Sequence, residues 1–185
     1  MAVYTRINDG DLSLIEKTFN TGKILSFSGI KKGIENTNYL IRTKNKKIIL
    51  TIFEKRVQKK DLPFFMDLMF GLSRQKIKCP EPIKNKKGKY LFKIKNKTAC
   101  LVSFLEGKDK INLTNKDCYV VGKNAALLHM AAKKLRIHRK NSLSVNSWGP
   151  LLNRIDKRIN KLSDNLINIM KNDLSDIKKK WPKNM

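Results

Sequence analysis

Three short apolar runs, separated by turn residues, constrain the fold of this chain more than any other feature. The runs cover residues 24–30, 37–43 and 47–53, and they are rich in Ile, Leu, Phe, Tyr and Thr. The connecting residues, 31–36 and 44–46, include Gly and Asn, which are typical of turns. Because short apolar runs bounded by turns are typical of strands, we expect three consecutive antiparallel strands.

Two helical patterns flank these strands. Before them, Asp9 or Asp11 is predicted to cap a short helix that ends at Phe19. After them, Pro63 stands at a typical helix start, and apolar residues recur at helical spacing as far as Leu72. We expect this second helix to pack one of its faces on the sheet.

A second pair of strands and a helical region complete the predicted fold. Residues 89–95 and 98–105 are expected to form a hairpin, which brings the sheet to five strands. After Gly107 the pattern becomes helical, with Thr114 as the predicted cap of a helix that runs to about Lys134. The expected fold class is therefore α+β, with a five-stranded antiparallel sheet, one packed helix and then further helices.

The helical pattern continues toward the end of the chain. Apolar residues between 155 and 170 recur at helical spacing, and residues 173–181 predict one or two further turns. The change of pattern after Glu106 divides the chain into two expected parts. These are a sheet lobe of residues 1–106 and the start of a helical lobe, residues 107–185.

The strongly basic composition raises nucleic acid and anionic membranes as partners. The net charge is +26, from 41 basic and 15 acidic residues. However, 33 of the basic residues are lysines and 8 are arginines, whereas bidentate recognition of phosphate and guanine favours arginine. The basic residues are spread along the whole chain, without an aromatic stripe that can stack bases. We interpret the charge as a coding bias toward lysine and expect no specific nucleic-acid partner and no membrane partner.

The cysteines and the N-terminus indicate a reducing compartment. Cys79, Cys100 and Cys118 lie far apart and form no C-x-x-C pair, so a zinc site is not expected. The N-terminus lacks the pattern of a signal peptide, and no apolar run approaches the ~18 residues of a membrane span. We therefore expect a cytoplasmic protein.

Two segments have residues that suit the binding of a nucleotide. Gly33 lets the backbone approach a phosphate closely. Asn36, Thr37 and Asn38 add short polar groups to the same turn. Backbone groups of residues 103–105 lie where the two lobes are expected to join, and they can hydrogen-bond an adenine edge. Taken alone, the first segment is also typical of an ordinary turn, and the second of an edge strand followed by a turn. The order of the elements along the chain is what distinguishes nucleotide binding from these alternatives.

Several motifs occur in the order found in one known family. They cover nearly the whole chain, which makes them far more specific together than singly. The motifs are Met1–Thr5 (MAVYT), Gly33–Tyr39 (GIENTNY), Ile49–Arg56 (ILTIFEKR), Asp61–Phe65 (DLPFF), Cys79–Pro82 (CPEP), Val102–Gly107 (VSFLEG) and Leu128–His129. On these residues the chain resembles the bacterial homoserine kinases of the aminoglycoside phosphotransferase and choline kinase superfamily, whose fold is protein-kinase-like.

The resemblance implies an activity, two cofactors and a set of site residues. The activity is the phosphorylation of the L-homoserine hydroxyl in threonine biosynthesis, with ATP and Mg²⁺ as cofactors. The residues expected to face the phosphates of ATP are Gly33, Asn36, Thr37 and Asn38. The residues expected to frame the adenine are Ser103, Phe104 and Leu105. Homoserine is thus the expected small-molecule partner, and the oligomeric state is left open.

The chain departs from the superfamily at two charged positions. The third strand usually carries a Lys or Arg that holds the phosphates and pairs with a Glu on the next helix. Here Thr51 stands at the first position, and Phe64 or Phe65 at the second. Lys55 or Arg56 is a candidate replacement for the cation. The alternative is that both are solvated charges at the end of the strand.

The catalytic loop of the family, His-x-Asp-x-x-x-x-Asn, and a later metal-binding Asp are expected beyond Trp181. His138 and Arg139 imitate the start of this loop, but Lys140 occupies its carboxylate position. A protonated lysine can neither accept a proton nor bind Mg²⁺. We therefore expect catalytic and metal-binding residues outside this chain and no turnover by the chain alone. The alternatives are a non-catalytic module that binds a nucleotide or a protein and, less favoured, a basic nucleic-acid-binding protein.

Overall fold

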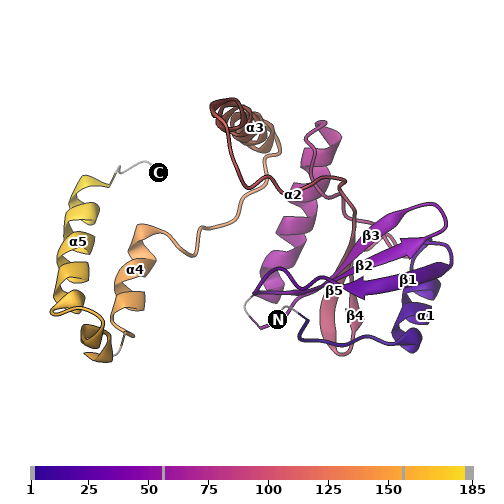
Figure 1. Ribbon diagram of the computed structural model, residues 1–185, viewed down its shortest axis with the longest axis horizontal. Helices are drawn as coiled ribbons and strands as arrows, with labels where there is room; N and C mark the ends of the chain where they lie inside the picture. The colour runs from indigo at the N-terminus through magenta and orange to yellow at the C-terminus, as the bar shows by residue number, and fades with distance from the viewer. Residues whose placement is uncertain (1–2, 56, 156, 182–185) are drawn as a thin grey trace. The chain divides into compact units, whose positions relative to one another are not determined.

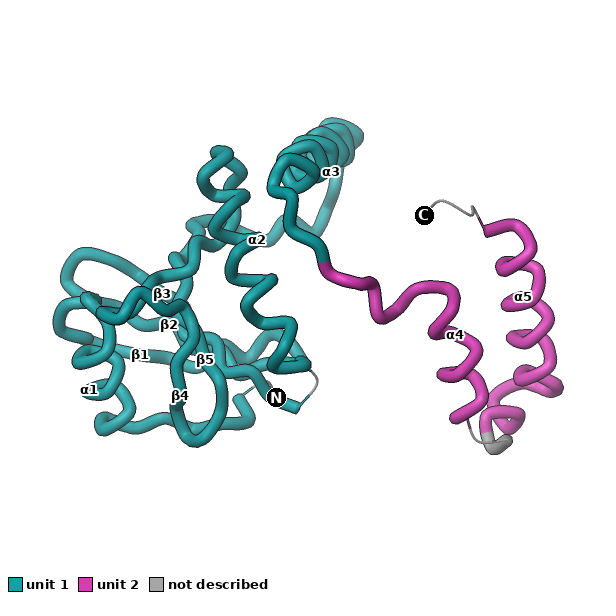
Figure 2. The backbone as a smooth tube through the Cα atoms, turned by 180° about the vertical axis from the view of Figure 1, so that it is seen from behind, with its two compact units in different colours: residues 1–138 teal, residues 139–185 magenta. Residues whose placement is uncertain are grey.

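The computed structural model describes residues 3–55, 57–155 and 157–181, which belong to two compact units (Figures 1 and 2). The first unit spans residues 1–138 and contains the sheet, and the second spans residues 139–185. The division at residue 106 that the sequence predicts falls inside the first unit, where strands give way to helices. That division stays a prediction.

All five expected strands form one antiparallel sheet in the first unit. They are β1 (Ile24–Gly29), β2 (Thr37–Thr43), β3 (Lys47–Ile52), β4 (Leu91–Ile94) and β5 (Lys97–Ser103). Their order across the sheet is β1-β2-β3-β5-β4, so β3 is the central strand. The β4–β5 hairpin turns at Lys95 and Asn96, whose φ angles of 47° and 60° suit a tight hairpin turn. The predicted strands are thereby confirmed.

The sheet carries a packed helix on each face. The helices of the first unit are α1 (Asp9–Thr18), α2 (Leu62–Arg74) and α3 (Asn115–Lys134), with a short 3-10 turn, η1 (Lys59–Asp61), before α2. On one face, Ile15 of α1 packs in a buried cluster with Leu101 of β5. On the other face, Met66 of α2 packs with Cys100 and Val102 of the same strand. Since successive strand residues point to opposite faces, one strand supplies both clusters.

The cap of α1 is Asn8, rather than either of the two aspartates expected there. Oδ1 of Asn8 accepts a hydrogen bond from the Asp11 amide (3.1 Å), and the Asn8 amide donates to Oδ2 of Asp11 (2.9 Å). This reciprocal pair is a capping box, in which Asp11 is the third helical residue. Asp9 and Asp11 thus lie in the first turn, where negative charge favours the helix dipole.

The starts of the other two helices agree with the sequence. α2 begins at Leu62, with Pro63 in its first turn. α3 is capped by Thr114, whose hydroxyl accepts a hydrogen bond from the Asp117 amide while the Asp117 side chain accepts from the Thr114 amide. Local side-chain chemistry therefore sets both helix starts.

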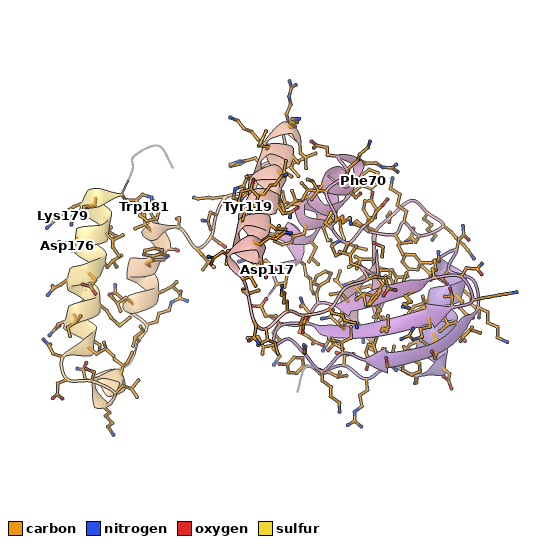
Figure 3. All side chains as sticks on the ribbon, turned by 45° about the horizontal axis from the view of Figure 1, so that its top comes forward. Phe70, Asp117, Tyr119, Asp176, Lys179 and Trp181 are labelled. Carbon is orange, nitrogen blue, oxygen red and sulfur yellow. The ribbon has the colours of Figure 1, made fainter. Side chains whose placement is uncertain are left out.

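The end of α3 lies against α2, although much of α3 is exposed. A Cβ at Gly71 of α2 would lie 2.7 Å from Cδ2 of Leu135, so the glycine leaves room for this side chain. Nε2 of Gln75 donates to the Ala131 carbonyl (2.9 Å). In contrast, Tyr119 near the start of α3 is exposed (Figure 3). None of the described helices, α3 included, is long and apolar enough to cross a membrane.

In the second unit, the helical pattern expected between residues 155 and 170 is interrupted. The elements there are α4 (Val145–Leu152), the 3-10 turn η2 (Lys157–Lys161) and α5 (Leu166–Lys180). Asn165, immediately before α5, has a φ of 56°, a left-handed conformation that asparagine tolerates better than most residues. The prediction of continuous helical spacing here is therefore wrong, because apolar periodicity does not detect such a turn.

Candidate functional site

A cleft of about 610 Å³ opens on the face of the sheet that carries α2. Its apolar wall includes Ile49 and Val102 of the sheet and Phe65 and Met69 of α2. Cys100 also lines this wall, and burial raises the pKa of its thiol to about 12. The wall therefore suits a flat apolar group, and the Cys100 thiol is protonated at neutral pH.

Five of the residues predicted from the sequence line this cleft together. They are Asn36, Asn38, Ser103, Phe104 and Leu105. They come from the turn before β2, from β2 itself and from the end of β5, which are far apart in the sequence. Gly33, Thr37 and Lys55 are not among the lining residues. Arg56 lies outside the described residues.

Hydrogen bonds hold the backbone at the end of β5 in place along the edge of the cleft. The Ser103 amide donates to the Glu81 carbonyl, and the Glu81 amide donates to Oγ of Ser103, both at 2.9 Å. The Phe104 amide donates to the Lys47 carbonyl at 3.4 Å. Among the residues that the structure describes, the Leu105 amide has no hydrogen-bond partner. This donor is therefore available at a defined position on the edge of the cleft.

Two asparagines near the start of β2 have their side chains anchored at the cleft. Oδ1 of Asn36 accepts a hydrogen bond from the Glu54 amide (3.4 Å), and Oδ1 of Asn38 accepts one from Oγ1 of Thr51 (2.8 Å). Each contact uses the oxygen of the side-chain amide and leaves its NH₂ group as a donor. Thr51, at the position where the superfamily usually has a cation, thus orients Asn38.

The turn between β1 and β2, residues 30–36, is here called the glycine turn. Gly33 has a φ of 105°, a conformation that glycine adopts without strain, and no atom beyond its own residue and its two chain neighbours lies within 4 Å of the place where a Cβ would be. Lys32 pairs with Asp109, but the two side chains are 84% and 76% exposed, so the pair contributes little. The position of this turn depends on contacts from outside it.

The Thr37 side chain points into the protein, in contrast to the expectation that it faces a ligand. The residue is fully buried. Its hydroxyl accepts hydrogen bonds from the amides of Tyr4 (2.9 Å) and Thr5 (3.1 Å) and donates to Oε1 of Glu54 (2.7 Å). A hydroxyl has one proton and two lone pairs, so all of its hydrogen-bonding capacity is used.

A polar cluster around Glu54 lies behind Thr37, and sequence reasoning missed it. Oε1 of Glu54 also accepts from Oγ1 of Thr5 (2.6 Å), and Oε2 is ion-paired with Lys97. The Glu54 side chain is only 10% exposed. Burial raises the pKa of Glu54, but hydrogen bonds from Lys97, Thr5 and Thr37 and the Lys97 charge outweigh it, so the pKa lies below its ordinary value. Lys97 is the first residue of β5, distant from Glu54 in the chain, and in the sequence it is one lysine among many.

Lys55, one of the two candidate cations, is exposed to solvent. In the part of the chain that the structure describes, no three His, Cys, Asp or Glu side chains form a group that can hold a metal ion. No chemical step through a metal is therefore derived from the described residues. Both candidate cations stay predictions.

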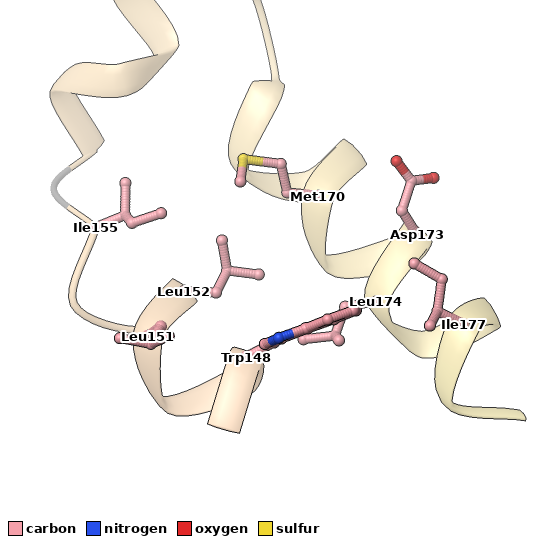
Figure 4. A pocket seen from close by; sticks show the side chains of 8 residues that line it. All are labelled: Trp148, Leu151, Leu152, Ile155, Met170, Asp173, Leu174 and Ile177. Carbon is pink, nitrogen blue, oxygen red and sulfur yellow. The ribbon is translucent and has the colours of Figure 1, made fainter. Parts of the chain in front are cut away.

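The second unit has a smaller cavity of its own, of about 370 Å³, between α4 and α5 (Figure 4). Trp148 and Leu152 of α4 and Met170 and Leu174 of α5 line it. Its lining is almost entirely apolar and includes none of the residues predicted as site residues. This cavity therefore lacks the polar groups that orient a nucleotide.

Comparison with known proteins shows similarity to phosphotransferases along most of the chain. Residues 26–173 match the family described as "Phosphotransferase enzyme family". The chain is 36% identical to a homoserine kinase of Parvibaculum lavamentivorans and 38% identical to one of Allorhizobium ampelinum, in each case over 185 residues. These alignments cover the whole chain but 58% of each relative, so the chain spans little more than half of their length.

One solved structure with a similar fold is a spectinomycin phosphotransferase, determined in complex with ADP and spectinomycin. The TM-score is 0.56 and the sequence identity 16%, and the alignment covers 95% of this chain and 56% of the other. At this identity the similarity shows the fold alone. It confirms the protein-kinase-like fold expected from the sequence.

The Glu54 cluster gives a pH-dependent prediction. Glu54→Gln should lower the free energy of unfolding by about 2 kcal/mol at neutral pH, because it removes a charged hydrogen-bond acceptor. A folded-state pKa below the ordinary value of 4.5 means that the carboxylate stabilises the fold above pH 4.5, and that this stabilisation is lost as the pH falls through the folded-state pKa. The difference between wild type and variant, measured by urea unfolding, should therefore shrink below pH 4.5.

The matched control is Glu106→Gln. Glu106 is ion-paired with Lys47 at 2.5 Å, but its side chain is 74% exposed, so the variant should be nearly as stable as wild type. A stability difference for Glu54→Gln that stayed constant well below pH 4.5 would contradict the assigned role of the carboxylate.

Proposed function

This chain belongs to the phosphotransferase enzyme family, and we propose that it forms the ATP-binding part of a homoserine kinase. The observation that carries this proposal is the single cleft lined by Asn36, Asn38 and residues 103–105. The sequence predicts that the two asparagines bind the phosphates and that residues 103–105 bind the adenine. The convergence of both sets on one cleft supports the idea that the cleft holds one nucleotide.

In the proposed complex, the adenine lies against the apolar wall of the cleft. The Leu105 amide donates a hydrogen bond to the adenine edge, while Ser103 and Phe104 hold the backbone in place. The wall residues Ile49 and Val102, which are paired neighbours on β3 and β5, lie against one face of the ring system. The apolar lining and the available amide match the chemistry of a purine base.

The phosphates are proposed to lie toward the glycine turn. The side-chain NH₂ groups of Asn36 and Asn38 act as donors, and Gly33 lets the backbone of the turn come close. Thr37 is fully buried and its hydroxyl is fully used within the protein, so it supports the turn from behind. Lys55 and Arg56 remain the proposed cations for the negative charge of the phosphates.

The remaining functions are assigned to the whole protein. We propose that Mg²⁺, which neutralises phosphate charge when bound, and the catalytic carboxylates are held by residues other than 1–185. Within the chain, residues 1–106 are proposed as the nucleotide-binding lobe and residues 107–185 as the start of the helical lobe. L-Homoserine is the proposed acceptor, in the cytoplasm, with no nucleic-acid or membrane partner.

The Leu105 amide gives a direct test of adenine binding. Leu105→Pro removes this donor, whereas the control Leu105→Ala shortens the side chain and keeps it. We expect Leu105→Pro to weaken ADP binding about tenfold, since the adenine then loses a hydrogen-bond donor. Leu105→Ala should change the affinity much less. Isothermal titration calorimetry with the 185-residue chain measures both, and equal losses in the two variants would contradict the role of the amide.

The acceptor is tested with a chimera. Residues 1–185 of this chain replace the aligned part of the Parvibaculum lavamentivorans homoserine kinase, and ADP release is measured with homoserine or spectinomycin as acceptor. We expect turnover with homoserine only, and no turnover by residues 1–185 alone. A folded chimera that binds ADP but does not phosphorylate homoserine would contradict the proposed substrate. A chain that binds no adenine nucleotide would contradict the proposed cleft itself.

A further inference from the structure

The segment that precedes α1 is fixed to β2 by side chains instead of by regular strand pairing. Hydrogen bonds from the amides of Tyr4 and Thr5 converge on the Thr37 hydroxyl (2.9 and 3.1 Å). The Tyr39 hydroxyl donates to the Thr5 carbonyl (2.9 Å) and accepts from the Ile7 amide (3.4 Å). Two side chains of β2 therefore define the path of residues 4–7, which we call the N-terminal brace.

The brace is fixed a second time by the Glu54 cluster. The Thr5 hydroxyl donates to Glu54 (2.6 Å) and accepts from the Lys97 ammonium (2.7 Å). Glu54 and Lys97 are ion-paired, so the brace is joined to the end of β3 and to the β4–β5 hairpin at one point. Because Glu54 is largely buried, these contacts are shielded from competing water.

From this fixed position the brace reaches the glycine turn. The Tyr4 hydroxyl donates to the Ile34 carbonyl at 3.0 Å, next to Gly33. The Glu54 amide supports the same turn from its other side, at Asn36. At the end of β1, Cγ2 of Val3 lies 2.8 Å from where a Cβ of Gly29 would be, so only glycine allows this approach without a shift. The end of β1 and two positions of the turn are thus contacted by residues outside the turn.

The glycine turn needs such support. Ile34 is 73% exposed, and the surroundings of Gly33 are open. A turn of this kind loses conformational entropy when a ligand orders it, which weakens binding. Contacts that order the turn in advance remove part of that cost. These contacts therefore strengthen the binding of that part of the ligand which the turn contacts.

We propose that the N-terminal brace presets the glycine turn for the phosphates of the nucleotide, and that Tyr4 is its positioning residue. This inference rests on the proposed function for the identity of the ligand. The inference goes beyond the proposed function because it assigns a role in phosphate binding to residues that do not line the cleft. The brace acts on phosphate binding and leaves the adenine end of the cleft unchanged.

The test is Tyr4→Phe, which removes one hydroxyl and keeps the ring. The control is Tyr119→Phe, the same change at an exposed tyrosine of α3. Affinities for ADP and for adenosine are measured by calorimetry with the 185-residue chain. Hydrogen–deuterium exchange is followed for the peptide that covers residues 30–36.

We expect Tyr4→Phe to weaken ADP binding about threefold, in line with the loss of one exposed hydrogen bond, and to leave adenosine binding unchanged. Exchange in the glycine turn should become faster, while Tyr119→Phe should match wild type in every measurement. Unchanged exchange in the turn of Tyr4→Phe would overturn the proposal, as would equal losses of ADP and adenosine affinity. If wild type binds neither ligand, the proposed function fails, and the exchange of the turn still decides whether the brace exists.

Discussion

The alternation of side chains along the neighbouring inner strands β3 and β5 is the constraint on which the rest of the first unit depends. Leu101 packs toward α1, and its neighbours Cys100 and Val102 pack toward α2. Both faces of the sheet must therefore be covered, and one helix serves each face. Where α2 leaves part of its face open, the apolar side chains that remain become the wall of the cleft. The same alternation thus produces a core and a binding surface.

Polar contacts, rather than apolar packing, determine the position of the other side of the cleft. The glycine turn has an exposed tip, so burial cannot fix it. Its supports are hydrogen bonds from Tyr4 and from the backbone of Glu54, whose carboxylate in turn anchors the N-terminal brace. In most of the superfamily a cation of the third strand contacts the phosphates directly. Here Thr51 stands at that position, and its hydroxyl orients Asn38.

The parts of the fold that were predictable from the sequence are those governed by local chemistry. The strands and the starts of α2 and α3 follow from turn residues, Pro63 and Thr114, all of which act within a few positions. The helical spacing expected from residue 155 to 170 failed, because the left-handed Asn165 does not alter apolar periodicity. The cleft residues were found through a family resemblance. The Glu54–Lys97 pair was not, because ion pairs between distant segments leave no local pattern.

We propose that one cleft, between the sheet and α2, holds a nucleotide with its adenine at residue 105 and its phosphates at residues 36–38. The most direct measurement is the change in backbone amide chemical shifts when ADP is titrated into the isotope-labelled chain. We expect the largest changes at Leu105 and at the amides of the glycine turn and Asn38. Changes confined to α4 and α5, or the absence of any saturable change, would contradict it.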